Sequence, residues 1–251
     1  MVNRFALHEA GVELSAITAN TAALIGDIAA DVVAADVRAD GYGHGAVEVA
    51  GAAIAGGATW LGVSSPAEGE RLRDFGLSVP ILSLSGDVPR ALAGLTPDAG
   101  DLAQLVLFGP ELYGLTEAAG TRAALRVTAR VVATKTIAAG EGVSYGHTYR
   151  ATTKTNLALV AIGYANGLDR FASNRGSLFL GGKPRIIAGR VAMNVCVVEL
   201  ADDIAEVGDE AVVFGYPALG EPSIGEWAAS IGKKPDEVVS VFGAHLPRRY
   251  S

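Results

Sequence analysis

The chain contains a single cysteine, Cys196, among its 251 residues. One thiol excludes an intrachain disulfide framework and a cysteine-based zinc site, and it makes the reducing cytoplasm the expected location. The four histidines lie far apart in the sequence without metal-ligand spacing, so we predict no metal site. Cys196 stands among valines, which predicts a buried thiol and not a nucleophile.

Basic residues and long apolar runs are also scarce. Lys and Arg number 20 against 27 Asp and Glu, and the net charge is −7. This balance argues against partners such as nucleic acid or an anionic membrane surface, although a small anion could be held locally. The start of the chain has no apolar signal core, and the longest uncharged window, residues 49–67, holds four glycines and a proline. We interpret that window as buried α/β structure and not as a membrane span.

Apolar residues, in contrast, are abundant: they make up half of the chain, and the mean hydropathy of the chain is +0.32. That composition predicts a sizeable core in one large domain or two modest ones. The first third alternates helix and strand patterns, with a helix start at Ser65-Pro66-Ala67-Glu68 in which Glu68 is expected to close a capping box with Ser65. Strands separated by helices at this spacing predict βαβ units and a parallel sheet. The expected helices are 14–28, 46–55 and one from 66, and the expected strands are 31–38, 60–63, 79–84 and 105–108.

The period changes to two from residue 123, where apolar and polar residues alternate as in a half-buried antiparallel strand. Gly181-Gly182 predicts a hairpin turn, and Ser223 to Glu226 predicts a helix cap. We therefore predict an α/β domain over 1–121 and a mostly antiparallel β domain over 122–251. The further expected strands are 157–162, 185–191, 195–200 and 211–214, with a last short helix over 235–244.

Residues 37–45, Val-Arg-Ala-Asp-Gly-Tyr-Gly-His-Gly, resemble the cofactor-lysine motif of alanine racemases, with Arg38 where that family has its lysine. The resemblance continues through 60–63 and 80–82, resumes at 112–115 and then runs almost unbroken to the end of the chain. Residues 140–149, Gly-Glu-Gly-Val-Ser-Tyr-Gly-His-Thr-Tyr, resemble the segment that carries the family's catalytic tyrosine. Together these segments cover most of the chain.

The resemblance implies a (β/α)8 barrel followed by a β domain. Members bind pyridoxal 5'-phosphate (PLP) as an imine on the barrel lysine and interconvert L- and D-alanine for D-alanine supply. In the family dimer, the tyrosine of one subunit's β domain enters the barrel mouth of the other subunit. The implied cofactor is thus PLP, the implied substrate is alanine, and the implied assembly is a homodimer or a heterodimer with a racemase subunit.

The length of the first domain does not allow a whole barrel, which takes roughly 250 residues. Residues 1–121 leave room for about four βα units. By the resemblance, the first three barrel strands and the last are present. We therefore predict a partial (β/α)-barrel remnant that cannot close, with open sheet edges and an uncovered interior face, followed by the β domain.

Arg38 stands where the resemblance implies the imine-forming lysine. A guanidinium stays protonated and offers only donors, so covalent PLP chemistry at Arg38 is not possible. It could grip a phosphate or carboxylate in bidentate fashion, or it could be an ion-paired remnant of lost function. Tyr145 stands at the family's second acid/base position, with His147 and Arg130 as candidate neighbours that would lower its pKa.

Two further site residues follow from the resemblance. Tyr42, in a glycine-rich turn, is implied to contact the cofactor phosphate. Met193 is implied to lie at the substrate through its backbone. His44 in the same turn as Tyr42 is more typical of a structural turn histidine than of a ligand.

Three functional hypotheses follow. The chain could be a PLP-dependent alanine racemase, impaired because Arg38 replaces the lysine and half the barrel is absent. It could be a non-catalytic partner that donates its Tyr145 β domain to a full-length racemase. It could also be a degenerate remnant or a binder of a small anion, including PLP held without a covalent bond.

Overall fold

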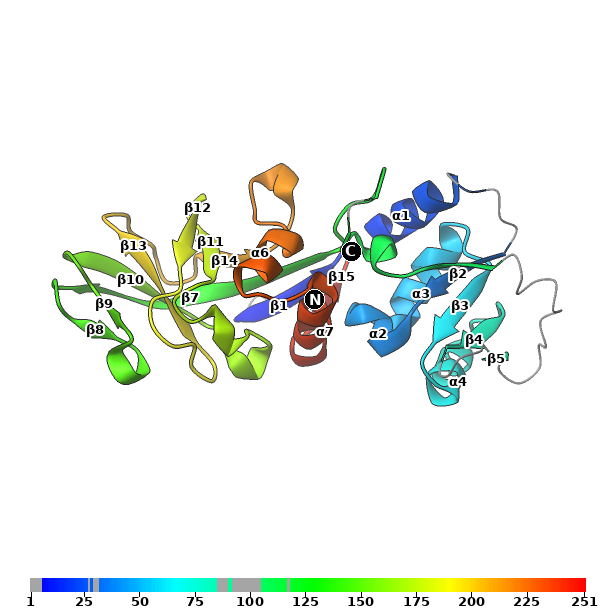
Figure 1. The fold of residues 1–251 in the computed structure, drawn as a ribbon, viewed down its shortest axis with the longest axis horizontal. Helices are drawn as coiled ribbons and strands as arrows, with labels where there is room; N and C mark the ends of the chain where they lie inside the picture. The colour runs from blue at the N-terminus through cyan, green and yellow to red at the C-terminus, as the bar shows by residue number, and fades with distance from the viewer. Residues whose placement is uncertain (1–5, 27, 29–31, 85–89, 92–104, 117) are drawn as a thin grey trace. The chain divides into compact units, whose positions relative to one another are not determined.

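A computed structural model describes residues 6–26, 28, 32–84, 90–91, 105–116 and 118–251 (Figure 1). Its contacts divide the chain into two compact units. Unit 2 comprises Val12–Ala124 and the last two residues, and unit 1 comprises the described residues up to Gly11 together with Leu125–Arg249. The N-terminal strand therefore belongs with the later part of the chain, an arrangement that a single boundary between residues 121 and 122 does not express.

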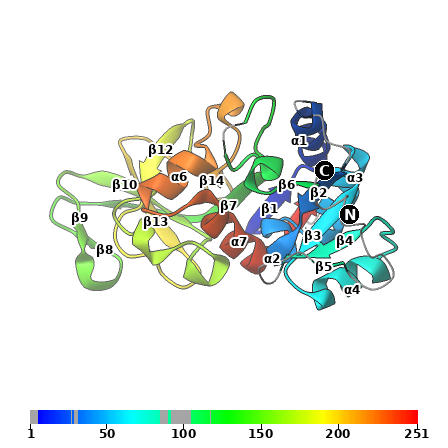
Figure 2. The same ribbon diagram turned by 45° about the vertical axis from the view of Figure 1, so that its right-hand side comes forward.

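Unit 2 contains a five-stranded sheet in the order β5-β4-β3-β2-β6 (Figure 2). Strands β4, β3, β2 and β6 are parallel to one another, and β5 pairs antiparallel with β4. Strands β4, β3, β2 and β6 thus lie side by side, and the sheet formed by the described strands does not close. The strands are β2 (Val32–Asp36), β3 (Trp60–Val63), β4 (Ile81–Ser83), β5 (Arg90–Ala91) and β6 (Leu105–Phe108).

The three helices predicted for unit 2 are present, and the turns Arg38–Tyr42 and Pro110–Tyr113 were not predicted. Ser65 accepts a hydrogen bond from the backbone N of Glu68 at the start of α4, although the Glu68 carboxylate accepts from Ser64 and so does not close the predicted box with Ser65. Asn20 of α1 bonds the carbonyl oxygens of Leu112 and Arg122, which fixes the end of the unit against its first helix. The helices are α1 (Leu14–Gly26), α2 (Arg38–Tyr42), α3 (Ala46–Ala55), α4 (Pro66–Asp74) and the 3-10 turn η1 (Pro110–Tyr113).

Apolar side chains of neighbouring strands pack against one another on this sheet. Ala34, Trp60 and Leu82 form a buried apolar cluster. The side chains packed against it are those of Val32, Leu84 and Leu105. The remnant therefore buries apolar surface without the missing strands.

Unit 1 is built on the long strand β7 (Leu125–Ile137), whose alternating residues match the period-two prediction. Its main sheet runs β12-β11-β14-β7-β1-β15, with β10 pairing β7 and β13 antiparallel. The remaining strands are β1 (His8–Val12), β8 (Gly142–Val143), β9 (Tyr149–Arg150), β10 (Thr155–Val160), β11 (Ser177–Leu180), β12 (Lys183–Ile186), β13 (Cys196–Ala201), β14 (Glu210–Phe214) and β15 (Arg248–Tyr250).

Two helices complete unit 1, α6 (Ile224–Ser230) and α7 (Pro235–His245). Ser223 and Glu226 form the predicted capping box at the start of α6, each accepting from the other's backbone N. Trp227 packs edge-on against Phe242, which joins the two helices at the sheet. An α/β remnant followed by a mostly antiparallel β domain is thereby confirmed.

Candidate active site

The turn after β2 carries Arg38 and Tyr42 at the carboxyl end of a parallel strand, the position where barrel enzymes place functional side chains. α2 is a left-handed turn and not a regular helix, because Ala39, Asp40 and Tyr42 have φ between 50° and 55°. Such a conformation costs an L-residue about 1–2 kcal/mol. The surrounding contacts must therefore hold this turn in place.

The strongest of these contacts converge on Asp36, the last residue of β2, which is only 1% exposed. Arg38 donates from Nε to Oδ1 at 2.9 Å and to Oδ2 at 3.0 Å, and from Nη2 to Oδ2 at 2.6 Å. The Tyr42 hydroxyl donates to Oδ2 at 2.9 Å, and the backbone N of Arg38 donates to Oδ1 at 3.1 Å. The Asp36 carboxylate is thus enclosed by donors from the very residues that the sequence assigns to the site.

These contacts set the protonation of both donors. Hydrogen bonds to the Asp36 carboxylate raise the pKa of Arg38 above its usual range, so the guanidinium is always charged. Burial, reinforced by the negative charge of Asp36, raises the pKa of Tyr42 to about 12. At neutral pH Tyr42 is therefore a neutral donor, and neither side chain can remove a proton from a substrate.

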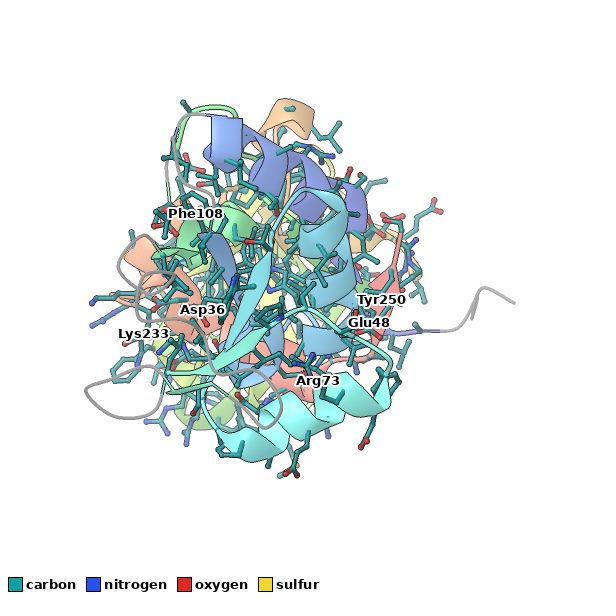
Figure 3. All side chains as sticks on the ribbon, turned by 90° about the vertical axis from the view of Figure 1, so that its right-hand side faces the viewer. Asp36, Glu48, Arg73, Phe108, Lys233 and Tyr250 are labelled. Carbon is teal, nitrogen blue, oxygen red and sulfur yellow. The ribbon has the colours of Figure 1, made fainter. Side chains whose placement is uncertain are left out.

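Sequence reasoning missed Asp36, which it treated only as part of an apolar strand. A signal was present, because Asp36 is the only charged residue in Val32–Asp36 and precedes Arg38 by two positions. Residues two apart in an extended segment project to the same side. Figure 3 labels Asp36 among the strands, whereas Glu48 and Arg73 lie on helices α3 and α4.

Three aromatic rings pack together at this turn. Tyr113 is fully buried and donates its hydroxyl to the backbone oxygen of Asp36 at 2.7 Å. Its ring lies 4.9 Å from that of Tyr42 and 4.7 Å from that of His44, centre to centre. His44 is buried with Nδ1 against the carbonyl oxygens of Gly41 and Tyr42, which suits a structural turn histidine.

The positions of the lysines decide whether this turn can hold PLP covalently. Residues 1–124 contain no lysine at all; the five lysines of the chain are Lys135, Lys154, Lys183, Lys233 and Lys234. The α/β unit therefore has no side-chain amine, and a delocalised, permanently charged guanidinium cannot replace one. With its charge and its Nε–Nη2 edge already taken by Asp36, Arg38 does not fit a PLP-linking residue.

Tyr145 lies in unit 1, on a 3-10 turn (η2, Tyr145–His147) between β8 and β9, and is 72% exposed. Ser144 has φ 58° and His147 has φ 46°, so the segment curls and is not extended. An extended segment would place His147 on the same side as Tyr145, and this segment does not have that conformation. The Ser144 hydroxyl donates to the carbonyl oxygen of Arg190 at 2.7 Å, which holds the turn against a neighbouring loop.

Met193 lies on that neighbouring loop, and its side chain is 54% exposed. Its backbone oxygen accepts from the backbone N of Ala165 at 2.9 Å, and Ala192 accepts in the same way from Tyr164. The loops of Tyr145, Met193 and Tyr164 are thus connected within unit 1. Arg38 and Tyr42 belong to unit 2, so the four predicted site residues fall into two pairs, one in each unit.

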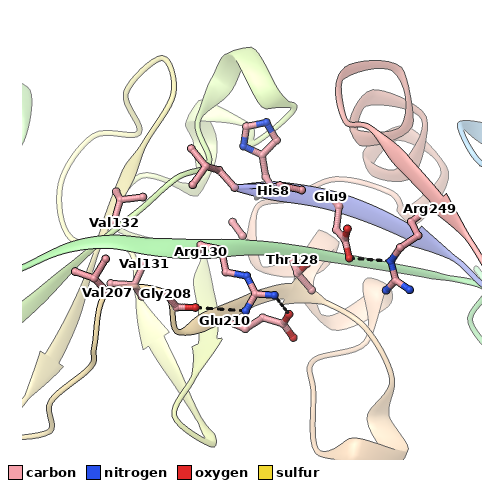
Figure 4. Close-up of a pocket in the computed structure, with 13 residues that line it drawn as sticks. His8, Glu9, Thr128, Arg130, Val131, Val132, Val207, Gly208, Glu210 and Arg249 are labelled. Carbon is pink, nitrogen blue, oxygen red and sulfur yellow. Dashed lines mark hydrogen bonds and ion pairs between the residues drawn. The ribbon is translucent and has the colours of Figure 1, made fainter. Parts of the chain in front are cut away.

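Arg130, expected as a neighbour of Tyr145, instead lines a groove of about 680 Å³ beside β1 and β7 (Figure 4). Its guanidinium pairs with Glu210 at 3.1 Å and donates to the carbonyl oxygen of Gly208 at 3.4 Å. Arg249 at the same groove pairs with Glu9 at 3.1 Å. Neither Tyr145 nor Met193 lines this groove, and both arginines there already have carboxylate partners.

Cys196 is 1% exposed, as predicted, and burial raises the pKa of its thiol to about 12. In the described part of the chain, no group of three or more His, Cys, Asp or Glu side chains is arranged to hold a metal ion. None of the helices within the described segments has the length and apolar character needed to cross a membrane.

Comparison with known proteins shows where this architecture belongs. The family model "Alanine racemase, N-terminal domain" matches residues 12–131, and "Alanine racemase, C-terminal domain" matches residues 124–250. The chain belongs to the alanine racemase family. The alanine racemase of Salinispora tropica is 31% identical over an alignment of 364 positions that spans 96% of this chain and 98% of the relative.

The solved structures agree with the fold of this alanine racemase family member. The alanine racemase of Streptomyces lavendulae has a TM-score of 0.87 at 27% identity. The superposition covers 98% of this chain and 97% of the Streptomyces chain. The alanine racemase of Bartonella henselae with covalently bound pyridoxal phosphate has a TM-score of 0.85, covering 98% of this chain and 100% of that one. At 20% identity, the second likeness shows the fold alone.

The matched relatives are alanine racemases, and the structure from Bartonella henselae carries covalently bound PLP. This chain has 251 residues, whereas its alignments with relatives run to 364 positions. Much of the relatives' length therefore faces gaps in this chain, in keeping with a sheet that holds four parallel strands.

Proposed function

We propose that this member of the alanine racemase family does not racemise alanine through PLP on its own. The observation that carries the proposal is the turn after β2, where Arg38 replaces the lysine and is paired with buried Asp36 in a unit without any lysine. Racemisation needs an amine that links the cofactor and a base that moves the α-proton. Arg38 supplies neither, and Tyr42 is held in its neutral form.

Borohydride trapping with PLP, followed by peptide mass spectrometry, tests this part. Borohydride reduces any imine between PLP and an amine to a stable secondary amine, which adds a phosphopyridoxyl group to that residue. We expect no stoichiometric adduct on any single residue, whereas a full-length alanine racemase treated in parallel should be labelled on its barrel lysine. A stoichiometric adduct on one of the five lysines would contradict the proposal and would call for racemase assays.

We further propose that the chain acts in the cytoplasm as a non-catalytic partner, which supplies the Tyr145 turn to a catalytic alanine racemase subunit. Tyr145 is 72% exposed on a turn held by Ser144 and Arg190, and Met193 is exposed on the connected loop. An exposed aromatic side chain on such a turn is suited to contacting another chain, since the backbone of the turn is already held and a tyrosine has few rotatable bonds to immobilise. Family dimers offer the matching barrel mouth.

Co-expression with a full-length alanine racemase under two different affinity tags tests the pairing. We expect tandem purification to recover both chains in equal amounts, and Tyr145→Phe to leave the pairing intact while it changes racemase activity per catalytic subunit. Recovery of homomers alone would exclude this partner role and would leave a degenerate remnant or a small-anion binder as the remaining hypotheses.

A further inference from the structure

The Asp36 carboxylate lies in the place of an anionic ligand within its own site. We propose that Asp36 acts as an internal anion that closes the turn to phosphate and carboxylate ligands, so that Arg38 and Tyr42 bind an external anion only when this carboxylate is removed. The inference rests on the proposed loss of covalent chemistry at Arg38, because it concerns what the arginine does in place of the lysine.

The hydrogen-bond geometry is that of a bound ligand. Nε and Nη2 of Arg38 grip the two carboxylate oxygens at 2.6–3.0 Å, which is the bidentate arrangement that arginine makes with carboxylates and phosphates. The Tyr42 hydroxyl completes the set at 2.9 Å. A phosphate arriving from solvent cannot use these three donors while Asp36 holds them, and the Nη1–Nη2 edge that remains belongs to a guanidinium whose charge Asp36 already neutralises.

The charge of the turn also opposes an external anion. The Asp36 carboxylate cancels the charge of Arg38, so the pair as a whole attracts no anion over distance. Glu111 adds a negative charge close by, where its Oε2 accepts from the backbone N of Gly109 at 3.0 Å. Gly109 itself lies against the site, since a Cβ atom built on it would be 3.3 Å from the Tyr42 hydroxyl and 3.6 Å from Asp36 Oδ2. The Glu111 carboxylate bound to its backbone N is therefore close to the Asp36 carboxylate.

The site would be reachable once it is opened. The Arg38 side chain is 40% exposed, whereas Asp36 beneath it is 1% exposed. Replacing the carboxylate by a neutral side chain therefore leaves a partly exposed guanidinium with a free bidentate edge and a free positive charge. Charge-assisted hydrogen bonds of this kind contribute roughly 1.5–3 kcal/mol each, which corresponds to about tenfold or more in affinity.

Titration of inorganic phosphate by calorimetry tests the proposal on the full chain. We expect no saturable binding by the wild type in the low millimolar range. Asp36→Asn should bind saturably, with a Kd about tenfold or more below the highest phosphate concentration at which the wild type shows no saturation. The Asp36→Asn/Arg38→Ala double variant should lose the gain. Asp40→Asn is the matched control, because it removes a carboxylate from the same turn but leaves the Arg38 partner in place, and it should behave as the wild type.

Two results would overturn the proposal. One is saturable phosphate binding by the wild type that is lost in Arg38→Ala, and the other is no gain in a folded Asp36→Asn. Circular dichroism establishes folding, Asp36→Ala replaces the asparagine variant if that variant unfolds, and the wild-type arm is decisive in any case. Phosphate has no aldehyde, so failure here leaves the borohydride result untouched, and an adduct in that experiment leaves this one untouched.

Discussion

At the scale of single residues, the pairing of Asp36 with Arg38 couples two positions that look independent in the sequence. A carboxylate that is 1% exposed is strongly disfavoured without a counter-ion, because burial removes its hydration. Arg38 supplies the opposite charge and Tyr42 a hydrogen bond. The arginine is thus a structural requirement of the strand end as well as the replacement of a reactive lysine.

We expect Arg38→Ala to lower the free energy of unfolding by about 2 kcal/mol, since it leaves a buried carboxylate without its charge partner. The figure is set below that of a fully buried pair because Arg38 is 40% exposed. The Asp36→Asn/Arg38→Ala double variant should recover more than half of the loss. Urea denaturation monitored by fluorescence measures each value.

Arg71→Ala is the control for this cycle. Arg71 pairs with Asp40 at 3.7 Å and is 59% exposed, so its removal should cost less than about 0.5 kcal/mol. An Arg38→Ala variant no less stable than Arg71→Ala, or a double variant without any recovery, would show that the two residues are not coupled.

At the scale of secondary structure, most elements could be predicted from the sequence because their signals are local. The helix over Ala46–Ala55 and the strands Trp60–Val63 and Leu105–Phe108 have the predicted bounds. The Gly181-Gly182 turn is also confirmed, with φ of 63° and 76° joining β11 to β12.

The misses at this scale arise from long-range pairing. The strand predicted over 185–191 is β12, Lys183–Ile186, because the hairpin register sets its start and Ile187 instead makes a single bridge to Val198. Strands β1 and β15 were not predicted, since each is short and β1 pairs with β7 while β15 pairs with β1. Asp36 is a different kind of miss, because its partners Arg38 and Tyr42 lie only two and six residues further along the chain.

Strand β7 is tied to β14 and the loop after it by an ionic network centred on Arg126. Its Nε and Nη2 donate to the buried carboxylate of Glu221 at 2.6–3.0 Å, and Nη2 also donates to Glu210 at 2.7 Å. Burial alone would raise the pKa of Glu221, but the hydrogen bonds from Arg126 and the Tyr216 backbone N outweigh it and hold that pKa below its usual value of 4.5.

We expect Glu221→Gln to destabilise the protein by about 2 kcal/mol at pH 7, because the Arg126 charge loses its best partner. The Glu221 pKa is lower in the folded state, so its contribution is complete above about pH 4.5 and is lost as the pH falls through the folded pKa. The difference between wild type and variant should therefore shrink below pH 4.5 in urea denaturation at several pH values. The exposed Asp202→Asn should stay within about 0.5 kcal/mol, and an equal loss there would contradict the network's role.

At the scale of the whole molecule, the open sheet limits what any change at Arg38 can achieve. Strands β4, β3, β2 and β6 are parallel and adjacent, so the described parallel strands of this sheet number four, whereas a whole barrel has eight. In barrel enzymes the site is assembled from the carboxyl ends of several different strands. The turn after β2 is one such end, and most of the others are absent from a chain of 251 residues.

We therefore expect Arg38→Lys to restore no measurable racemisation. The double variant Asp36→Asn/Arg38→Lys should do no better, although its lysine amine is no longer held in the charged form by the Asp36 carboxylate and is free to react with PLP. Residue 38 would then be the only lysine in the first 124 residues, so borohydride labelling there is easily mapped. A coupled assay for D-alanine, with a full-length racemase as the positive control, measures turnover. Labelling without turnover would place the defect in the missing strands, because linking the cofactor does not orient its ring, its phosphate or the substrate. Substantial turnover by Arg38→Lys alone would show that four strands suffice, and that the arginine alone silences the enzyme.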